Sequence, residues 1–166
     1  MMVALDTNVL AYAEGLNGGE KKTEALDLLE QLPPASTLIP LQALGELFSV
    51  LVRKARRSRD DARAAVLSWG DTFPVIETSS SVILIAGDLA VAHQMGFWDA
   101  VILSSAADAR CRLLLSEDLQ DGFTWSGVTV VNPFSPQRHK LLDAFLAGET
   151  KREPVRRANR TSKRSH

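Results

Sequence analysis

Four carboxylates lie at positions in the sequence where an α/β protein brings side chains together. Asp6 follows a short apolar run, Asp118 follows another, and Asp99 comes directly before the apolar residues of a helical segment. Glu46 lies on the polar face of a predicted helix that begins just after a further strand. Because an α/β sheet opens its ligand crevice at the carboxyl ends of its strands, we expect these four acids to converge there.

Clustered carboxylates predict a metal site, because they repel one another unless a cation lies among them. Mg²⁺ and Mn²⁺ prefer hard oxygen ligands and keep several waters, which suits phosphate chemistry. Such a metal lowers the pKa of a bound water and stabilises the charge of a phosphodiester during hydrolysis. No nucleophilic side chain is then needed, and the sequence contains no G-x-S-x-G, no Cys–His pairing and no P-loop.

Each acid also has an ordinary structural explanation. Asp6 and Asp99 stand where the N-cap of a following helix belongs, and a side-chain oxygen at that position accepts a backbone N–H. Glu46 lies in the middle of a helix, where glutamate is usually solvated. Asp118 belongs to the polar run 117–122, which is typical of a turn. The joint placement of the four acids, rather than any one of them, therefore indicates a site.

The apolar pattern predicts strands that alternate with helices, often two helices in a row. We expect strands at 2–5, 37–39, 73–76, 111–115 and 128–131, and helices at 8–14, 20–32, 40–55, 60–70, 79–95, 99–109 and 137–146. This order favours an α/β fold, with a mostly parallel sheet and helices on both faces. Gly96 is expected to end the helix before it. The apolar face of helix 40–55 is predicted to be Leu41, Leu44, Phe48, Leu51 and Val52.

The composition limits the classes of protein to which the chain can belong. A chain of 166 residues with 45% hydrophobic residues fits one globular domain. No apolar run approaches the ~20 residues of a membrane span, and we expect no secretory signal. Cys111 is the only cysteine, which excludes an internal disulfide and fits a reducing cytoplasm. The three histidines are scattered and form no zinc pattern.

Four short motifs occur in a fixed order along the chain. They are Leu-Asp-Thr-Asn-Val-Leu at 5–10, Ala-Leu-Gly-Glu-Leu at 43–47, Phe-Trp-Asp-Ala-Val-Ile at 97–102 and Leu-Leu-Ser-Glu-Asp-Leu at 114–119. In this order they resemble the motifs of PIN-domain ribonucleases, and most of all those of the VapC-type toxins of bacterial toxin–antitoxin pairs. The resemblance covers roughly residues 2–133.

The resemblance implies a PIN-like three-layer sandwich and an endoribonuclease that depends on Mg²⁺ or Mn²⁺. It also implies a homodimer and a cognate antitoxin whose tail blocks the site. Carried over to this sequence, the catalytic and metal-binding residues are Asp6, Glu46, Asp99 and Asp118, with Asp121 as an alternative for the fourth acid. Ser116 and Asn8 are expected to support these carboxylates.

The net charge of −1 hides an asymmetry along the chain. Residues 1–147, the expected nuclease domain, hold 18 acids and 12 Lys or Arg, whereas residues 148–166 hold 2 acids and 7 Lys or Arg. The basic segment is either a solvated, disordered tail or a contact for RNA phosphates. A second basic segment, at 53–59, makes Arg53, Arg56 and Arg57 candidates for RNA contact.

Two other functions are compatible with parts of the pattern. A catalytically weak, PIN-like nucleic-acid-binding protein is the main alternative, although a pure binder of polyanions has no use for an acidic pocket. A phosphatase of the haloacid dehalogenase type would start from Asp6, but that family needs a second aspartate where Asn8 stands and a later lysine. Residues 75–119 contain no lysine, which argues against it.

Overall fold

Each of the first three connections between strands contains two α-helices. β1 (Val3–Leu5), β2 (Thr37–Pro40), β3 (Val75–Ile76) and β4 (Leu113–Leu115) are the strands so connected. The paired helices are α1 (Thr7–Ala13) and α2 (Gly19–Gln31), α3 (Leu41–Arg53) and α4 (Arg59–Thr72), and α5 (Ser80–His93) and α6 (Phe97–Asp108). A hairpin of β5 (Thr124–Trp125) and β6 (Val128–Val131) and the helix α7 (Lys140–Glu149) follow. The structure, a computed structural model, describes residues 1–149.

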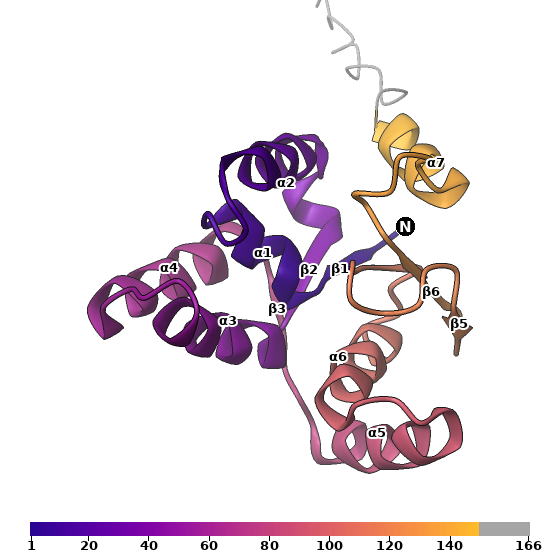
Figure 1. Cartoon of the computed structure of the whole chain (residues 1–166). Helices are drawn as coiled ribbons and strands as arrows, with labels where there is room; N and C mark the ends of the chain where they lie inside the picture. The colour runs from indigo at the N-terminus through magenta and orange to yellow at the C-terminus, as the bar shows by residue number, and fades with distance from the viewer. Residues whose placement is uncertain (150–166) are drawn as a thin grey trace, which may run out of the picture.

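The six strands form one sheet in the order β3-β2-β1-β4-β6-β5, parallel except for β5. The chain builds outward from β1 to β2 and β3, and then returns to place β4 on the other side of β1. Because such crossovers are right-handed, this reversal puts α5 and α6 on the face opposite α1–α4. In Figure 1 the α5–α6 pair lies apart from the α1–α2 and α3–α4 pairs. The expected three-layer α/β fold is thereby confirmed.

The reversal of strand order lies between β1 and β4, and it determines where polar side chains meet. Both strands are wholly apolar and fully buried, as expected for parallel strands covered on both faces. The hydrogen-bond ladders continue one residue beyond each strand, from the Asp6 N–H to the Leu115 carbonyl of β4 and from the Ser116 N–H to the Val131 carbonyl of β6, both at 3.0 Å. Asp6 and Ser116 are therefore held side by side at the carboxyl edge of the sheet.

Two expectations about helix ends are wrong. Gly96 does not end α5, because α5 stops at His93 and the left-handed residue after it is Gln94, with φ 50° and ψ 38°. Gly96 has φ −56° and ψ 138° and instead occupies the N-cap of α6. Helix α6 thus begins at Phe97, two residues earlier than predicted.

The apolar face of α3 is also rotated relative to the prediction. Leu41 is 48% exposed, whereas Ala43 and Leu47 are fully buried. Leu44 and Leu51 are buried as expected. Helix α3 packs against α1, α4, α6 and β2, so its contact surface is wider than a single apolar stripe. Gln42, Glu46, Ser49 and Arg53 of α3 line a surface hollow.

Two further features concern the ends of the predicted elements. The sequence pattern did not reveal β5, whose two residues pair with β6. Helix α7 runs to Glu149, two residues past the predicted domain boundary at 147. The rest of the predicted basic tail, residues 150–166, lies outside the described residues. Within residues 1–149 no helix has the length and apolar character needed to cross a membrane.

Candidate active site

Asp6 is a buried carboxylate whose oxygens both accept hydrogen bonds. It is the N-cap of α1, where Oδ1 accepts the Thr7 backbone N–H at 2.7 Å. Oδ2 accepts from Ser116 Oγ at 2.6 Å and from Asn8 Nδ2 at 3.2 Å. Burial raises the pKa of Asp6 to about 6, although the bonds from Ser116 and Thr7 oppose the shift. Asp6 therefore caps a helix and also belongs to the acidic cluster.

Ser116 and Asn8 connect Asp6 to the loop that carries Asp118. Asn8 Nδ2 also lies 3.2 Å from Asp118 Oδ2, and Asn8 Oδ1 accepts the Glu117 backbone N–H at 3.3 Å. Ser116 Oγ donates to Asp6 and lies 3.3 Å from the backbone N–H groups of both Asp118 and Leu119. Two small polar side chains thus fix the loop after β4 against the start of α1.

Glu46 points toward this network from α3 and is only partly exposed. Its Oε2 accepts from Thr7 Oγ1 at 3.0 Å, and its Oε1 accepts from Gln42 Nε2 at 3.0 Å. Thr7 therefore joins the Asp6 end of β1 to Glu46, across 39 residues of sequence. The charge of Glu46 contributes to raising the pKa of Asp6 and of Asp99, so this side chain is not a solvated surface glutamate.

Asp99 is the third residue of α6, and its explanation as the N-cap is wrong because Gly96 holds that position. The Asp99 carboxylate folds back along the first turn, so that a Cβ added at Gly96 would lie 2.9 Å from Asp99 Oδ2. Burial raises the pKa of Asp99 above its ordinary value, and the charges of Glu46 and Asp118 raise it further. The four acids are therefore close enough to act on one another.

Asp118 and Asp121 have different roles in the loop after β4. Asp118 bonds Asn8 and acts electrostatically on Asp99. The exposed Asp121 accepts the Asn132 backbone N–H at 2.8 Å and so fastens this loop to the end of β6. Asp118 is therefore the acid that the structure brings to Asp6, Glu46 and Asp99.

The donor chemistry suits a hard cation, but the carboxylates are not arranged around one point. Carboxylate, hydroxyl and amide oxygens are the ligands that Mg²⁺ and Mn²⁺ prefer. In the described part of the chain, however, no three His, Cys, Asp or Glu side chains are placed so that they could hold a metal ion. Both carboxylate oxygens of Glu46 accept hydrogen bonds, from Thr7 and Gln42. Both carboxylate oxygens of Asp6 accept hydrogen bonds from its three donors. Holding a cation therefore requires some of these side chains to move.

Two surface hollows, each of about 350 Å³, lie beside Glu46. The first, which we call the α1 hollow, is lined by Tyr12, Asn17, Lys54 and Asp118 among others. The second, the α6 hollow, is lined by Gln42, Gly45, Glu46, Ser49, Val50, Arg53 and Trp98. Each hollow contains one basic side chain, so an anionic chain that passes over Glu46 would meet a cation on both sides.

The three arginines predicted to contact RNA differ in their surroundings. Arg53 lines the α6 hollow. Arg57 is bound to Glu14 of the α1 end, with Nη1 2.6 Å from Oε2 and Nη2 bonded to the Glu14 carbonyl. Arg56 is exposed and lines neither hollow beside Glu46.

Thr7, Gln42, Lys54 and Trp98 were not predicted as site residues. Gln42 precedes Glu46 by one helical turn, and Trp98 immediately precedes Asp99. These spacings were the sequence signals that could have identified Gln42 and Trp98 as site residues.

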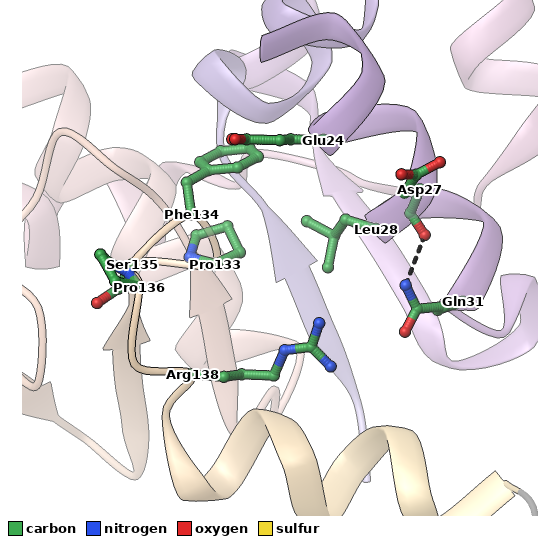
Figure 2. A pocket seen from close by; sticks show the side chains of 9 residues that line it. All are labelled: Glu24, Asp27, Leu28, Gln31, Pro133, Phe134, Ser135, Pro136 and Arg138. Atoms are coloured by element: carbon green, nitrogen blue, oxygen red, sulfur yellow. Dashed lines mark hydrogen bonds between the residues drawn. The ribbon is translucent and has the colours of Figure 1, made fainter. Parts of the chain in front are cut away.

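Another hollow, of about 450 Å³, lies between α2 and the loop 133–138 and contains none of the four acids. Figure 2 shows the Arg138 guanidinium directed into it, toward Leu28 and Gln31 of α2. Its acidic lining residues, Glu24 and Asp27, lie on the exposed side of α2. This hollow is separate from the acidic cluster and shares no lining residue with the hollows beside Glu46.

Comparison with protein families shows to which family the chain belongs. The profile of the PIN domain matches residues 3–121, which include all four clustered acids. The chain belongs to the PIN domain family. The resemblance of its motifs to PIN-domain proteins is thereby confirmed, while a search of curated protein sequences gave no match.

Several solved structures share the PIN fold. VapC20 from Mycobacterium tuberculosis, a toxin that cleaves the sarcin–ricin loop, superposes with a TM-score of 0.60 at 18% identity, over 70% of this chain and 89% of that chain. A toxin–antitoxin complex from Klebsiella pneumoniae gives 0.59 at 25% identity, over 80% and 98%. FitAcB from Neisseria gonorrhoeae gives 0.60 at 18% identity, over 80% and 99%. The similar structures thus include toxins of toxin–antitoxin pairs.

Proposed function

We propose that this PIN-domain protein is a metal-dependent endoribonuclease, and that it acts as the toxin of a toxin–antitoxin pair. The observation that supports this most is that Asp6, Glu46, Asp99 and Asp118, which come from four separate segments, lie together where the strand order reverses, and that the charges of Glu46 and Asp118 contribute to the raised pKa of Asp99. Ionised carboxylates placed together repel one another, and a bound cation would compensate that repulsion.

The four acids are proposed to hold Mg²⁺ or Mn²⁺. When bound, the cation would activate a water and stabilise the charge of the phosphodiester. Ser116 and Asn8 hold Asp6 and Asp118 in place, while Thr7 and Gln42 orient Glu46. Removal of a donor that holds a metal-binding side chain in place typically changes metal affinity or activity by about 10- to 100-fold.

Basic side chains beside the cluster must offset its charge before RNA can approach. Arg53 and Lys54 line the two hollows on either side of Glu46. They are proposed to contact phosphates of the strand that crosses the cluster, because Lys and Arg supply the sequence-independent part of RNA affinity. Arg57 is proposed to support the fold through Glu14 instead.

The partners are proposed by analogy with the similar structures. Solved neighbours of this chain include a toxin–antitoxin complex and a toxin that cleaves the sarcin–ricin loop. We propose RNA as the substrate, a cognate antitoxin as the inhibitor, a homodimer as the assembly and the cytoplasm as the location. The main alternative remains a PIN protein that binds nucleic acid and cleaves it weakly.

Cleavage of labelled RNA by the purified protein tests the proposal. We expect cleavage with Mg²⁺ or Mn²⁺, none with excess EDTA, and recovery when the metal is restored. Asp6→Asn should abolish it, and Asp121→Asn serves as the matched control because Asp121 lies in the same region but outside the cluster. Binding of RNA without cleavage under all metal conditions would favour the alternative. Full cleavage by Asp6→Asn, or in excess chelator, would overturn the proposal.

A further inference from the structure

We infer that Trp98 is a stacking platform for a nucleobase of the RNA, with Arg53 contacting a neighbouring phosphate. This inference rests on the proposed function, because it concerns the substrate of the same site. Trp98 lies in the first turn of α6, directly before Asp99, and lines the α6 hollow together with Glu46 and Arg53. Trp98 therefore lies between the acidic cluster and the surface along which a bound RNA strand would continue.

The indole of Trp98 is half exposed although it is a large, mainly apolar group. Trp98 is 52% exposed and the preceding Phe97 is 38% exposed. Burying either ring inside the domain would contribute to stability, so an exposed aromatic pair at the edge of a polar cluster indicates a binding surface. Single-stranded RNA is recognised mainly through unstacked bases that stack on aromatic side chains.

The ring of Trp98 is held in place before any ligand binds. Phe97 meets it edge to face, with 4.9 Å between the ring centroids and an angle of 73° between the planes. This contact limits the rotamers of the indole, so less conformational freedom remains to be lost when a base stacks on it.

The surroundings of Trp98 favour RNA over a protein partner. The side chains that line the hollow beside it are mostly polar or charged, including Gln42, Glu46, Ser49 and Arg53. The buried centres of protein interfaces are depleted in charged residues. A base on an aromatic ring with a phosphate on a nearby cation is, in contrast, the usual combination in single-strand binding grooves.

Arg53 is available to such a phosphate. Its Nε lies 3.4 Å from the Ser49 carbonyl, and no carboxylate among residues 1–149 forms a salt bridge with it. The guanidinium group suits phosphate because it presents several donors in one plane. Trp98 and Arg53 would thus bind adjacent parts of one nucleotide unit, base and backbone.

Equilibrium binding of fluorescein-labelled, twelve-nucleotide single-stranded RNA in EDTA tests the inference without cleavage. Loss of a stacked base typically weakens binding about 5- to 150-fold. We expect Trp98→Ala to weaken binding by an amount in this range, with an unchanged dependence on salt, and Trp98→Phe to retain most of the affinity. Arg53→Gln should instead flatten the dependence on salt by about 0.7 in log K against log salt.

An abasic oligonucleotide of the same length isolates stacking from other effects of the substitution. Wild type and Trp98→Ala should bind it equally, because no base is present to stack. Equal affinities of the two proteins for normal RNA would overturn the inference, as would a difference that persists on the abasic strand. A lower mass of Trp98→Ala in sedimentation, with unchanged RNA affinity, would instead assign Trp98 to a contact between copies of the chain and would also overturn it.

Cleavage assays separate this inference from the proposed function. If wild type binds RNA through Trp98 but never cleaves it, the proposed function fails and the stacking site stands. If wild type cleaves RNA and Trp98→Ala has the same KM and kcat, the proposed function stands and the stacking site is overturned.

Discussion

The two halves of the acidic cluster are built differently. In the half formed by β1 and β4, Asp6 accepts three hydrogen bonds and is linked to Asp118 through Asn8 and Ser116. In the half formed by α3 and α6, Glu46 accepts bonds from Thr7 and Gln42, whereas Asp99 accepts no hydrogen bond from any residue between 1 and 149. The pKa of Asp99 is raised by its burial and by the charges of Glu46 and Asp118. We call the first the fixed half, because the protein alone holds its acids, and the second the open half, because Asp99 has no such support.

This contrast follows from the elements that carry the residues. The fixed half lies one residue beyond two paired, fully buried strands, where the backbone ladder leaves little freedom. In the open half, Asp99 lies on the exposed first turn of α6, and Glu46 borders two hollows, one of which is also lined by the exposed indole of Trp98. Such a combination of a fixed half and a carboxylate without a hydrogen-bond donor is expected where a cation and a substrate must bind.

Removal of a charge from the open half should have a larger effect than removal of a support from the fixed half. Asp99→Asn keeps the shape of the side chain and removes its charge, and cleavage should fall by about two orders of magnitude or more. Because Asp99 is not the helix cap, the substitution should not weaken α6. In the absence of metal the variant should unfold at the wild-type temperature or above, since one repelling charge is gone. Cleavage at the wild-type rate would remove Asp99 from the site.

Removal of a support from the fixed half should have an intermediate effect. Ser116→Ala deletes the hydroxyl that donates to Asp6 and fastens the following loop, so cleavage should fall by about 10- to 100-fold. The Ser116 bond lowers the pKa of Asp6, so the pH at which activity appears should also move upward. Ser116→Thr, which retains the hydroxyl, is the control. An unchanged pH profile in Ser116→Ala would show that this bond does not control the charge of Asp6.

The stability of the metal-free protein should depend on pH through Asp6. Its pKa rises from 3.8 to about 6 on folding, so between these values the folded state binds more protons than the unfolded state. Stability should therefore be highest at low pH as far as this group is concerned, and fall by on the order of 3 kcal/mol as pH rises through about 6. Melting temperatures of wild type and Asp6→Asn in EDTA, compared from pH 4 to 8, measure the difference. A parallel pH dependence in both proteins would contradict the assignment.

The smallest effect is expected at Asp121, which lies near the fixed half but outside it. Asp121→Asn retains an oxygen that can accept the Asn132 N–H, so cleavage should stay within about twofold of wild type and stability within about 0.5 kcal/mol. The same cleavage assay and a thermal melt check both numbers. A loss of cleavage comparable to that of Asp99→Asn would place Asp121 in the cluster after all.

The sequence contained most of the information about the sheet, because buried parallel strands are short apolar runs that are easily distinguished from the surrounding helices. Val3–Leu5, Leu113–Leu115 and Val128–Val131 were all predicted as strands. The two-residue strand β5 was missed, since its only partner is the neighbouring strand of its own hairpin and it has no alternation to detect. Gly96 was misread because a glycine suits either end of a helix, and here the preceding Gln94 adopts the left-handed conformation.

The position of a side chain in the fold could be predicted where the residue follows a strand, and less well where packing decides. Asp6 and Asp118 were found because their place after β1 and β4 fixes their direction. Glu46 was ambiguous, since helical periodicity alone cannot tell a face that borders solvent from one that borders a cleft. The bond from Thr7 to Glu46 joins residues 39 positions apart, and no local pattern signals it.

Thermal unfolding with and without Mn²⁺, at pH 7.5, tests most directly whether the open half is completed by a cation. At 100 times its Kd, a single bound ion stabilises the folded state by about 2.7 kcal/mol, which corresponds to a rise of roughly 5–11 °C for a domain of this size. Wild type and Asp121→Asn should both show this rise, while Asp99→Asn and Glu46→Gln should show much less of it. An equal rise in all four proteins, or no rise in wild type, would contradict a metal site formed by these carboxylates.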